Sequence, residues 1–277
     1  GSRGSGVGAQ QPAEYKPFAS QCESIPLGET NLRYCIQGTN GQRVNARQIV
    51  YVFHGMGGNA EFVNQYPNLP LSQELRTTMG DETPLFIGLS TGQSGALSYN
   101  ASIVFQKGLA EIESRVASGA VASRHLIGLS MGGHNATRLA AEGGASAFRS
   151  VSLLCPALMP VEDPHDNQEV AAYRARHAAY LDANFFGVAL GLFRRTFPTR
   201  SDWQANSPFE LLRSGRFDGL QFFLSTGEQD NLGLIEGTLA WKNESEGRRI
   251  PAKMENLAGS HCVFNNRAFV DFVRAVL

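Results

Sequence analysis

The feature that most constrains the fold is a series of short apolar runs separated by longer stretches with helical spacing. The runs are rich in branched and aromatic residues, and they cover 49–55, 84–90, 124–130, 150–158, 220–226 and, less apolar, 249–259. Runs that are apolar on both faces are typical of a parallel sheet, because helices cover both of its sides. Apolar residues within 103–116 and 269–273 recur at helical spacing. The alternation predicts an α/β fold with a mostly parallel central sheet and helices on both faces.

A chain of this size has room for one large domain or two small ones. Of its 277 residues, 42% are hydrophobic and 18% are charged, which supports a sizeable core and excludes a disordered protein. The formal net charge of -1 provides no basic field for phosphates, so we expect no nucleic-acid partner. The densest apolar run, 185–193, is well short of the ~20 residues that span a bilayer, so we expect no transmembrane segment. We expect residues 1–17 to be a disordered lead-in and 18–277 to be a single domain.

One long segment, from residue 160 to about 216, has no strand pattern. It carries many aromatic residues among arginines and prolines, and it is too long for a simple crossover between strands. The segment predicts a helical cap inserted into the domain over a pocket. Phe185 and Phe186 are the candidate substrate-binding residues of this cap. The alternative is that its aromatic side chains only pack the cap onto the body.

The pattern Gly-x-Ser-x-Gly, which places a nucleophilic serine on a sharp strand-to-helix turn, occurs twice. Residues 88–92 surround Ser90, and residues 128–132 surround Ser130. Both pentapeptides follow a predicted strand, but only Ser130 is followed by an Ala- and Gly-rich helical pattern, whereas Ser90 precedes a sequence typical of a loop. Ser130 is therefore the candidate nucleophile, and Ser90 is interpreted as a strand-end residue near the mouth of the site.

Acyl transfer also requires backbone N–H groups that are placed in advance to stabilise a developing oxyanion. One such donor follows the nucleophile, which makes Met131 the candidate. The second comes from the loop after an earlier strand. The sequence HGMGG (54–58) offers Met56 first and Gly57 second, with glycines that let the backbone approach a substrate closely. His54, which opens this loop, is expected to brace it and not to act as a base.

The remaining members of a catalytic triad are expected in the chain order nucleophile, acid, histidine. Asp230 and Glu228 both follow the apolar run 220–226, and Asp230, which lies further along the turn, is the candidate acid. His261 lies after the last predicted strand and before the last helix, where the base is expected. Ser130 would attack a carbonyl carbon, His261 would take its proton, and Asp230 would orient the imidazole. The histidines interpreted as surface or packing residues are His125, His134, His165 and His177.

Taken together, these motifs resemble the α/β-hydrolase superfamily, and more narrowly its branch that includes esterase D, feruloyl and acetyl esterases, and the mycolyltransferases. The resemblance extends over most of residues 48–277, and the matching sequences are HGMGG (54–58), GLSMGGHNA (128–136), FRSVSLLCPAL (148–158), GEQD (227–230) and GSHCVF (259–264). It implies the α/β-hydrolase fold and ester hydrolysis without a metal or an organic cofactor. The segment 160–216 departs from this branch and leaves the substrate class open.

The four cysteines bear on the cellular compartment. Cys22 and Cys35 lie in two alternating runs joined by residues 28–30, which predicts a hairpin, and we expect a disulfide between its strands. The alternative is two reduced, half-buried thiols. A disulfide implies an oxidising compartment, so we expect a secreted or periplasmic protein whose signal peptide has been removed. Cys155 is interpreted as a buried core thiol, and the pairing of Cys155 and Cys262 is left open.

The leading functional prediction is a serine carboxylic-ester hydrolase that cleaves a small-molecule or carbohydrate-linked ester through an acyl-enzyme intermediate. The same triad serves an acyltransferase or an acyl-glutathione thioesterase, although a secreted, disulfide-bearing chain counts against glutathione conjugates. A non-catalytic binding protein is disfavoured by the complete set of Ser130, Asp230 and His261. Glu162, with the polar residues crowded around it at 162–166, lacks the spacing of a metal site, so no metal is expected.

Overall fold

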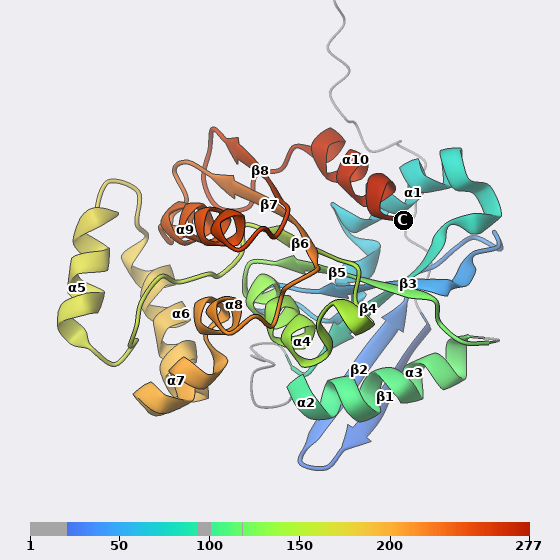
Figure 1. Cartoon of the computed structure of the whole chain (residues 1–277), viewed down its shortest axis with the longest axis horizontal. Coiled ribbons are helices and arrows are strands. Elements are labelled where there is room, and N and C mark those ends of the chain that lie inside the picture. Colours follow the sequence, from blue (N-terminus) through green and yellow to red (C-terminus); the bar gives the residue numbers. More distant parts are fainter. Residues whose placement is uncertain (1–20, 93–100, 118) are drawn as a thin grey trace, which may run out of the picture.

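The computed structural model of the chain describes residues 21–92, 101–117 and 119–277, and it shows a central sheet between layers of helices (Figure 1). The predicted lead-in, 1–17, and residues 93–100 of the loop-like sequence after Ser90 lie outside the described residues. The strands are β1 (Gln21–Leu27), β2 (Thr30–Ile36), β3 (Asn45–Phe53), β4 (Pro84–Ser90), β5 (Ser123–Leu129), β6 (Ser150–Leu154), β7 (Gln221–Gly227) and β8 (Ala252–Leu257). The helices are α1 (Asn68–Met79), α2 (Ala101–Ile103), α3 (Leu109–Val116), α4 (Met131–Ala147), α5 (Asn167–Arg176), α6 (Ala183–Thr196), α7 (Arg200–Asn206), α8 (Pro208–Arg213), α9 (Leu234–Gly247) and α10 (Asn266–Val276). Short helical turns of other types are η1 (Ala60–Asn64), η2 (Gly80–Glu82) and η3 (Val104–Gly108).

The strands form one eight-stranded sheet in the order β1-β2-β4-β3-β5-β6-β7-β8. Neighbours from β4 through β3 to β8 are parallel, whereas β2 pairs antiparallel with both β1 and β4. The six apolar runs are β3 to β8, which confirms the predicted α/β class. In a parallel sheet the carboxyl ends of the strands lie at one edge, where such folds place their ligands. The loops that follow β3, β5, β7 and β8 therefore open at the same edge.

Two apolar clusters attach helices to the two faces of the sheet. Because successive strand residues point to opposite faces, Tyr51 belongs to one cluster and its neighbour Val52 to the other. The first cluster joins the sheet to η3, α3, α4, α8 and α9, around the fully buried Trp241. The second joins it to η1, α1 and α10. Figure 1 shows α1 and α10 together on one side of the sheet and α3 and α4 on the other.

The antiparallel edge of the sheet is the predicted hairpin. Cys22 of β1 and Cys35 of β2 are direct register partners, and a disulfide joins them, as the sequence predicted. Gly28 in the turn has a φ of 76°, a conformation that glycine adopts without steric cost. The disulfide therefore fastens the register of an edge strand that has only one neighbour.

The segment 160–216 is described throughout, and it contains four helices, α5 to α8, and no strand, as predicted. Side chains of α5, α6 and α7 form a third apolar cluster, which includes Phe193, Trp203 and also Met131 at the start of α4. By contrast, α8 places Phe209 in the cluster of the sheet. Within the segment predicted as a cap, α5 to α7, at the left of Figure 1, share one cluster and are called the cap below, whereas α8 packs with the body.

Candidate active site

Ser130 lies on the turn between β5 and α4, at the carboxyl end of a central strand. Its φ of 53° is unusual for a residue other than glycine and is typical of the strained turn that exposes a nucleophile. Backbone crowding explains the two flanking glycines. A Cβ on Gly128 would lie 2.2 Å from the carbonyl oxygen of Gly132, and a Cβ on Gly132 would lie 2.3 Å from that of Phe53.

Ser90, in the other pentapeptide, has a different environment. It is the last residue of β4 and is buried, and its Oγ lies 2.7 Å from Nε2 of His54. His54 Nδ1 lies 2.6 Å from the carbonyl oxygen of Gly55, which only accepts, so Nδ1 carries the proton and Nε2 accepts the Ser90 hydroxyl. Burial lowers the pKa of His54 from its ordinary value. Among the described residues, no carboxylate is a hydrogen-bond partner of this pair, and its contacts brace the loop that begins at His54.

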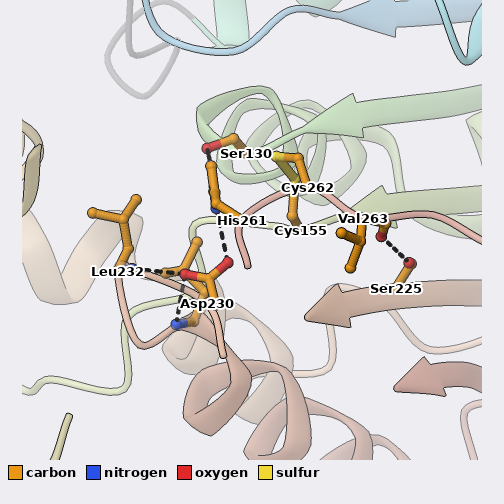
Figure 2. Close-up of a disulfide and its surroundings, with 9 residues drawn as sticks. Ser130, Cys155, Ser225, Asp230, Leu232, His261, Cys262 and Val263 are labelled. Carbon is orange, nitrogen blue, oxygen red and sulfur yellow. Dashed lines mark hydrogen bonds and ion pairs between the residues drawn. A yellow bond between two sulfur atoms is a disulfide. The ribbon is translucent and has the colours of Figure 1, made fainter. Parts of the chain in front are cut away.

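Ser130, His261 and Asp230 form a hydrogen-bonded chain at the carboxyl edge of the sheet (Figure 2). His261 Nε2 lies 2.9 Å from Ser130 Oγ, and His261 Nδ1 lies 2.8 Å from Asp230 Oδ2. With its proton on Nδ1, the imidazole donates to the carboxylate and accepts the serine hydroxyl at Nε2. This geometry allows the imidazole to remove a proton from the serine.

The two candidate acids differ in burial and in hydrogen bonding. The Asp230 side chain is 0% exposed, and its Oδ1 accepts the backbone N–H groups of Leu232 at 2.8 Å and Leu234 at 3.3 Å. Glu228, in the same turn, is exposed. The structure therefore places Asp230 and not Glu228 beside His261, with both carboxylate oxygens oriented by donors.

The two backbone segments predicted as oxyanion donors both line the cavity beside the candidate nucleophile. Met56 follows β3 in the loop braced by His54, and Met131 is the first residue of α4. Both line the same cavity as Ser130, whereas Gly57 does not. Gly57 has a φ of 84°, so its contribution is the turn of the loop.

A cavity of about 210 Å³ opens beside Ser130 and His261. Its walls come from the loop after β3, the start of α4, the loop after β6, α6 and the loop between β8 and α10. The turn between β7 and α9 that holds Asp230, called the acid turn below, completes them. The lining residues are Gly55, Met56, Leu129, Ser130, Met131, Ala157, Met159, Phe185, Phe186, Ala189, Phe193, Leu232, Leu234, His261 and Cys262. Among these lining residues, only Ser130 and His261 have a side chain with an O–H or N–H group. The cavity is therefore apolar apart from the reacting side chains.

Phe185 and Phe186 both line this cavity but have different surroundings. Phe185 is half-buried, and its ring meets the ring of His261 edge-on, with centroids 5.6 Å apart. Phe186 is 2% exposed and stacks on Tyr173, with centroids 5.5 Å apart, while the guanidinium of Arg174 lies 5.0 Å from its ring centre. Phe185 thus borders the reacting histidine, and Phe186 belongs to the interior of the cap.

Cys155 is buried, as predicted, but it is a disulfide-bonded residue and not a thiol. Cys155 is bonded to Cys262, with sulfurs 2.04 Å apart. Cys155 lies one residue beyond β6, where its φ of 42° turns the chain out of the strand, and Cys262 directly follows His261. The available signal was positional: both cysteines follow strands whose carboxyl ends lie at the same edge.

Sequence reasoning also missed Tyr173 as a contact of the acid turn. Its hydroxyl donates to the carbonyl oxygen of Leu232 at 2.7 Å, and the N–H of Leu232 donates to Asp230. Burial raises the pKa of Tyr173 well above its ordinary value, and the charges of Glu236 and Asp230 act in the same direction. The hydroxyl therefore remains a neutral donor that links α5 of the cap to the acid.

The other histidines have local partners. His125 contacts the Ser150 hydroxyl at 2.8 Å, His165 contacts the Phe197 carbonyl at 2.6 Å, and His177 contacts Glu236 at 3.0 Å. His134 is buried among the rings of the cap. In the 162–166 loop, Asp163 accepts the N–H of His165, and Asp166 caps the N-terminus of α5. The groups of that loop thus serve turn and cap structure.

Neither a scan of protein-family models nor a search of curated protein sequences finds a match. Solved structures share the fold. They include a ferulic acid esterase (TM-score 0.61, 14% identity, covering 94% of this chain and 96% of that one) and a carboxyl esterase from Bacillus coagulans (TM-score 0.58, 15%, 94% and 99%). A third is an S-formylglutathione hydrolase from Agrobacterium tumefaciens (TM-score 0.59, 15%, 94% and 98%). The chain therefore has the α/β-hydrolase fold, as the sequence predicted. The three neighbours are esterases or hydrolases by name.

Proposed function

We propose that this protein is a serine carboxylic-ester hydrolase. The observation that carries the proposal is the hydrogen-bonded chain from Ser130 through His261 to the buried Asp230. The Ser130 end of this chain lies beside an apolar cavity. The names of the structural neighbours support the same chemistry.

In the proposed mechanism, His261 removes the hydroxyl proton of Ser130 as Oγ attacks the ester carbonyl. The imidazolium then protonates the departing alcohol, which leaves an acyl-serine, and water activated by His261 releases the acid. Asp230 holds the proton on Nδ1 and stabilises the imidazolium. The backbone N–H groups of Met131 and Met56 are the proposed donors to the oxyanion, with Gly57 as the second choice in the loop after β3.

The cavity supports an apolar acyl group. Its volume of about 210 Å³ is many times the ~10–15 Å³ that admits a single water molecule, so several carbon atoms fit inside it. Its apolar walls would desolvate the hydroxyls of a sugar without replacing their hydrogen bonds. A carbohydrate-linked ester would therefore place its acyl group in the cavity and its sugar outside. Phe185 and Phe186 are proposed to contact the acyl group.

The same geometry also serves acyl transfer to an alcohol other than water, or thioester hydrolysis. The two disulfides favour an oxidising compartment, secreted or periplasmic, in which acyl-glutathione is not the expected substrate. In the described part of the chain, no helix is long and apolar enough to cross a membrane. We propose hydrolysis as the main activity, because the structural neighbours are esterases or hydrolases by name.

The test is hydrolysis of an activated aryl ester by the wild type and two serine variants. Ser130→Ala is expected to lower turnover by about 10⁴-fold or more, because the nucleophile is lost while the fold remains. Ser90→Ala is the comparison at the serine of the other pentapeptide, and it should cost far less turnover, because that hydroxyl only supports the loop of His54. A fluorophosphonate should add its mass to the peptide that contains Ser130. The proposal is wrong if Ser130→Ala retains wild-type turnover.

A further inference from the structure

The second disulfide, Cys155–Cys262, lies beside the reacting groups in Figure 2. We propose that this disulfide is a positioning device, which fastens the loop of His261 to the backbone that frames Ser130, so that turnover depends on its oxidised state. This inference rests on the proposed ester hydrolysis.

On the nucleophile side, the segment after β6 holds the backbone of Ser130 at two points. The N–H of Ser130 donates to the carbonyl oxygen of Leu154, and the N–H of Ala157 donates to the carbonyl oxygen of Ser130, both at 2.9 Å. Cys155 lies between these contacts, and its own N–H donates to Ser225 in β7 at 2.7 Å. Its sulfur therefore projects from the segment that fixes the nucleophile.

On the base side, His261 belongs to the loop between β8 and α10. The start of this loop is held where Gly259 exchanges hydrogen bonds with Gln229, at 2.9 and 2.6 Å. Further along, the Ser225 hydroxyl makes a long contact of 3.4 Å with the carbonyl oxygen of Val263. Between these contacts, the disulfide at Cys262 is a covalent link immediately next to His261.

Backbone conformation indicates that the disulfide constrains this loop. Cys155 and Cys262 have φ angles of 42° and 63°, in the left-handed region that residues with a Cβ rarely adopt. Such conformations persist where the surroundings enforce them. Without the covalent link, residue 262 is free to leave that region and to rotate the adjacent His261. Asp230 would keep its place, because backbone donors in its own turn hold it.

The consequence falls mainly on turnover. A loosened loop changes the distances from His261 to Ser130 Oγ, 2.9 Å, and to Asp230 Oδ2, 2.8 Å. Displacement of a reacting group by about 1 Å can cost on the order of 10²-fold in rate. The cavity wall formed by α6 is anchored in the cap cluster and remains in place, whereas His261 and Cys262 belong to the part of the wall that moves. We therefore expect a large fall in kcat and a much smaller change in KM.

A small dithiol has a route to this disulfide. Cys155 is 0% exposed, but Cys262 lines the cavity beside Ser130. Attack by one dithiothreitol thiolate on a sulfur gives a mixed disulfide, and the second thiolate closes the reagent to its cyclic disulfide. Two electrons and two protons thereby pass to the protein, which is left with two thiols. An occupied cavity should slow this reduction.

The experiment compares two double variants with the wild type. Cys155→Ala with Cys262→Ala removes the disulfide at the site, and Cys22→Ala with Cys35→Ala removes the hairpin disulfide as the matched control. Steady-state kinetics is measured before and after dithiothreitol and again after reoxidation. Differential alkylation and mass spectrometry record which thiols are free. The nuclear magnetic resonance signal of the His261 Nδ1 proton reports directly on its bond to Asp230.

We expect kcat of the first variant to be low, by on the order of 10²-fold, and insensitive to the reductant. The control variant should have normal kcat and lose it on reduction, as the wild type should, with recovery on reoxidation and a parallel loss and return of the Nδ1 proton signal. The inference is overturned if Cys155 and Cys262 are alkylated while kcat and the Nδ1 signal stay normal. It is also overturned if activity falls only together with the near-ultraviolet circular dichroism of the whole fold.

If the first variant does not fold, reduced wild type decides the question by the same readouts. Failure of the proposed function has a different signature, because the oxidised wild type would then hydrolyse no ester and Ser130 would not react with a fluorophosphonate.

Discussion

Phe185 and Phe186, adjacent residues of α6, allow packing of the cap and selection of the substrate to be measured separately. Phe186→Ala removes a ring that is 2% exposed and stacked on Tyr173. Truncation of a buried phenylalanine costs ~3–5 kcal/mol of the free energy of unfolding. In a domain of this size each kcal/mol lowers the melting temperature by about 2–4 °C, so we expect a drop of roughly 10 °C.

Phe185→Ala should change the preferred acyl chain more than it lowers the melting temperature. The side chain is half-buried, and its ring borders His261 and the cavity. Loss of a half-buried phenylalanine side chain costs about 1–2 kcal/mol, so the melting temperature should change by only a few degrees. The cavity gains the volume of the ring, so the preferred acyl chain should become longer.

The assay measures kcat/KM for p-nitrophenyl esters from acetate to laurate, alongside thermal unfolding of both variants and the wild type. The reasoning is refuted if Phe185→Ala lowers the melting temperature as much as Phe186→Ala does and leaves the relative rates across the acyl series unchanged. That result would place both rings in the core of the cap.

Three other predictions concern the acid turn and the buried histidines. Asp230→Asn should lower turnover by about 10⁴-fold, because the amide favours the wrong imidazole tautomer, whereas Glu228→Gln should be mild; turnover of both on one activated ester checks this, and the reverse result would exchange their roles. Tyr173→Phe leaves the carbonyl oxygen of Leu232 without its donor, so urea unfolding should show a loss of about 1–3 kcal/mol and kcat should fall severalfold at constant KM. Burial lowers the pKa of His125 to about 4 and that of His134 to about 3, so both bind protons on unfolding below pH 6.5. Stability should therefore fall as the pH falls from 6.5 towards these values, by about 2 kcal/mol per histidine at pH 5, and an unchanged urea midpoint between about pH 7.5 and 5 would contradict this.

The sheet was predictable because strands buried on both faces are continuous apolar runs. The predicted run 84–90 coincides with β4, and 124–130 and 220–226 differ from β5 and β7 by one residue at each end. The last run was placed too broadly, at 249–259, because β8 (Ala252–Leu257) is only partly buried and its apolar signal is weak.

Proximity between distant residues was only partly predictable. Ser130, Asp230 and His261 each follow a predicted strand, and parallel strands end at one edge of a sheet. The apolar runs and the order of these residues in the chain were therefore enough to predict that the three lie together. The Cys155–Cys262 disulfide depends on the direction in which two left-handed residues turn the chain, and neither residue is a glycine that would signal it. The contact of Tyr173 with the acid turn depends on how the cap packs, which helical spacing alone does not determine.

The apolar core that α5 to α7 share with the body also bears on tolerance to sequence change. Besides side chains of these helices, the cluster holds body residues that lie next to the candidate site: Met131, Ala157, Met159, Val161, Leu232 and Leu234. Substitutions within residues 167–206 therefore alter a core that reaches the site, whereas the two clusters on the faces of the sheet keep their own packing. By the same logic, a cap from another hydrolase should be graftable onto this body if the graft presents a surface that accepts all of these body residues.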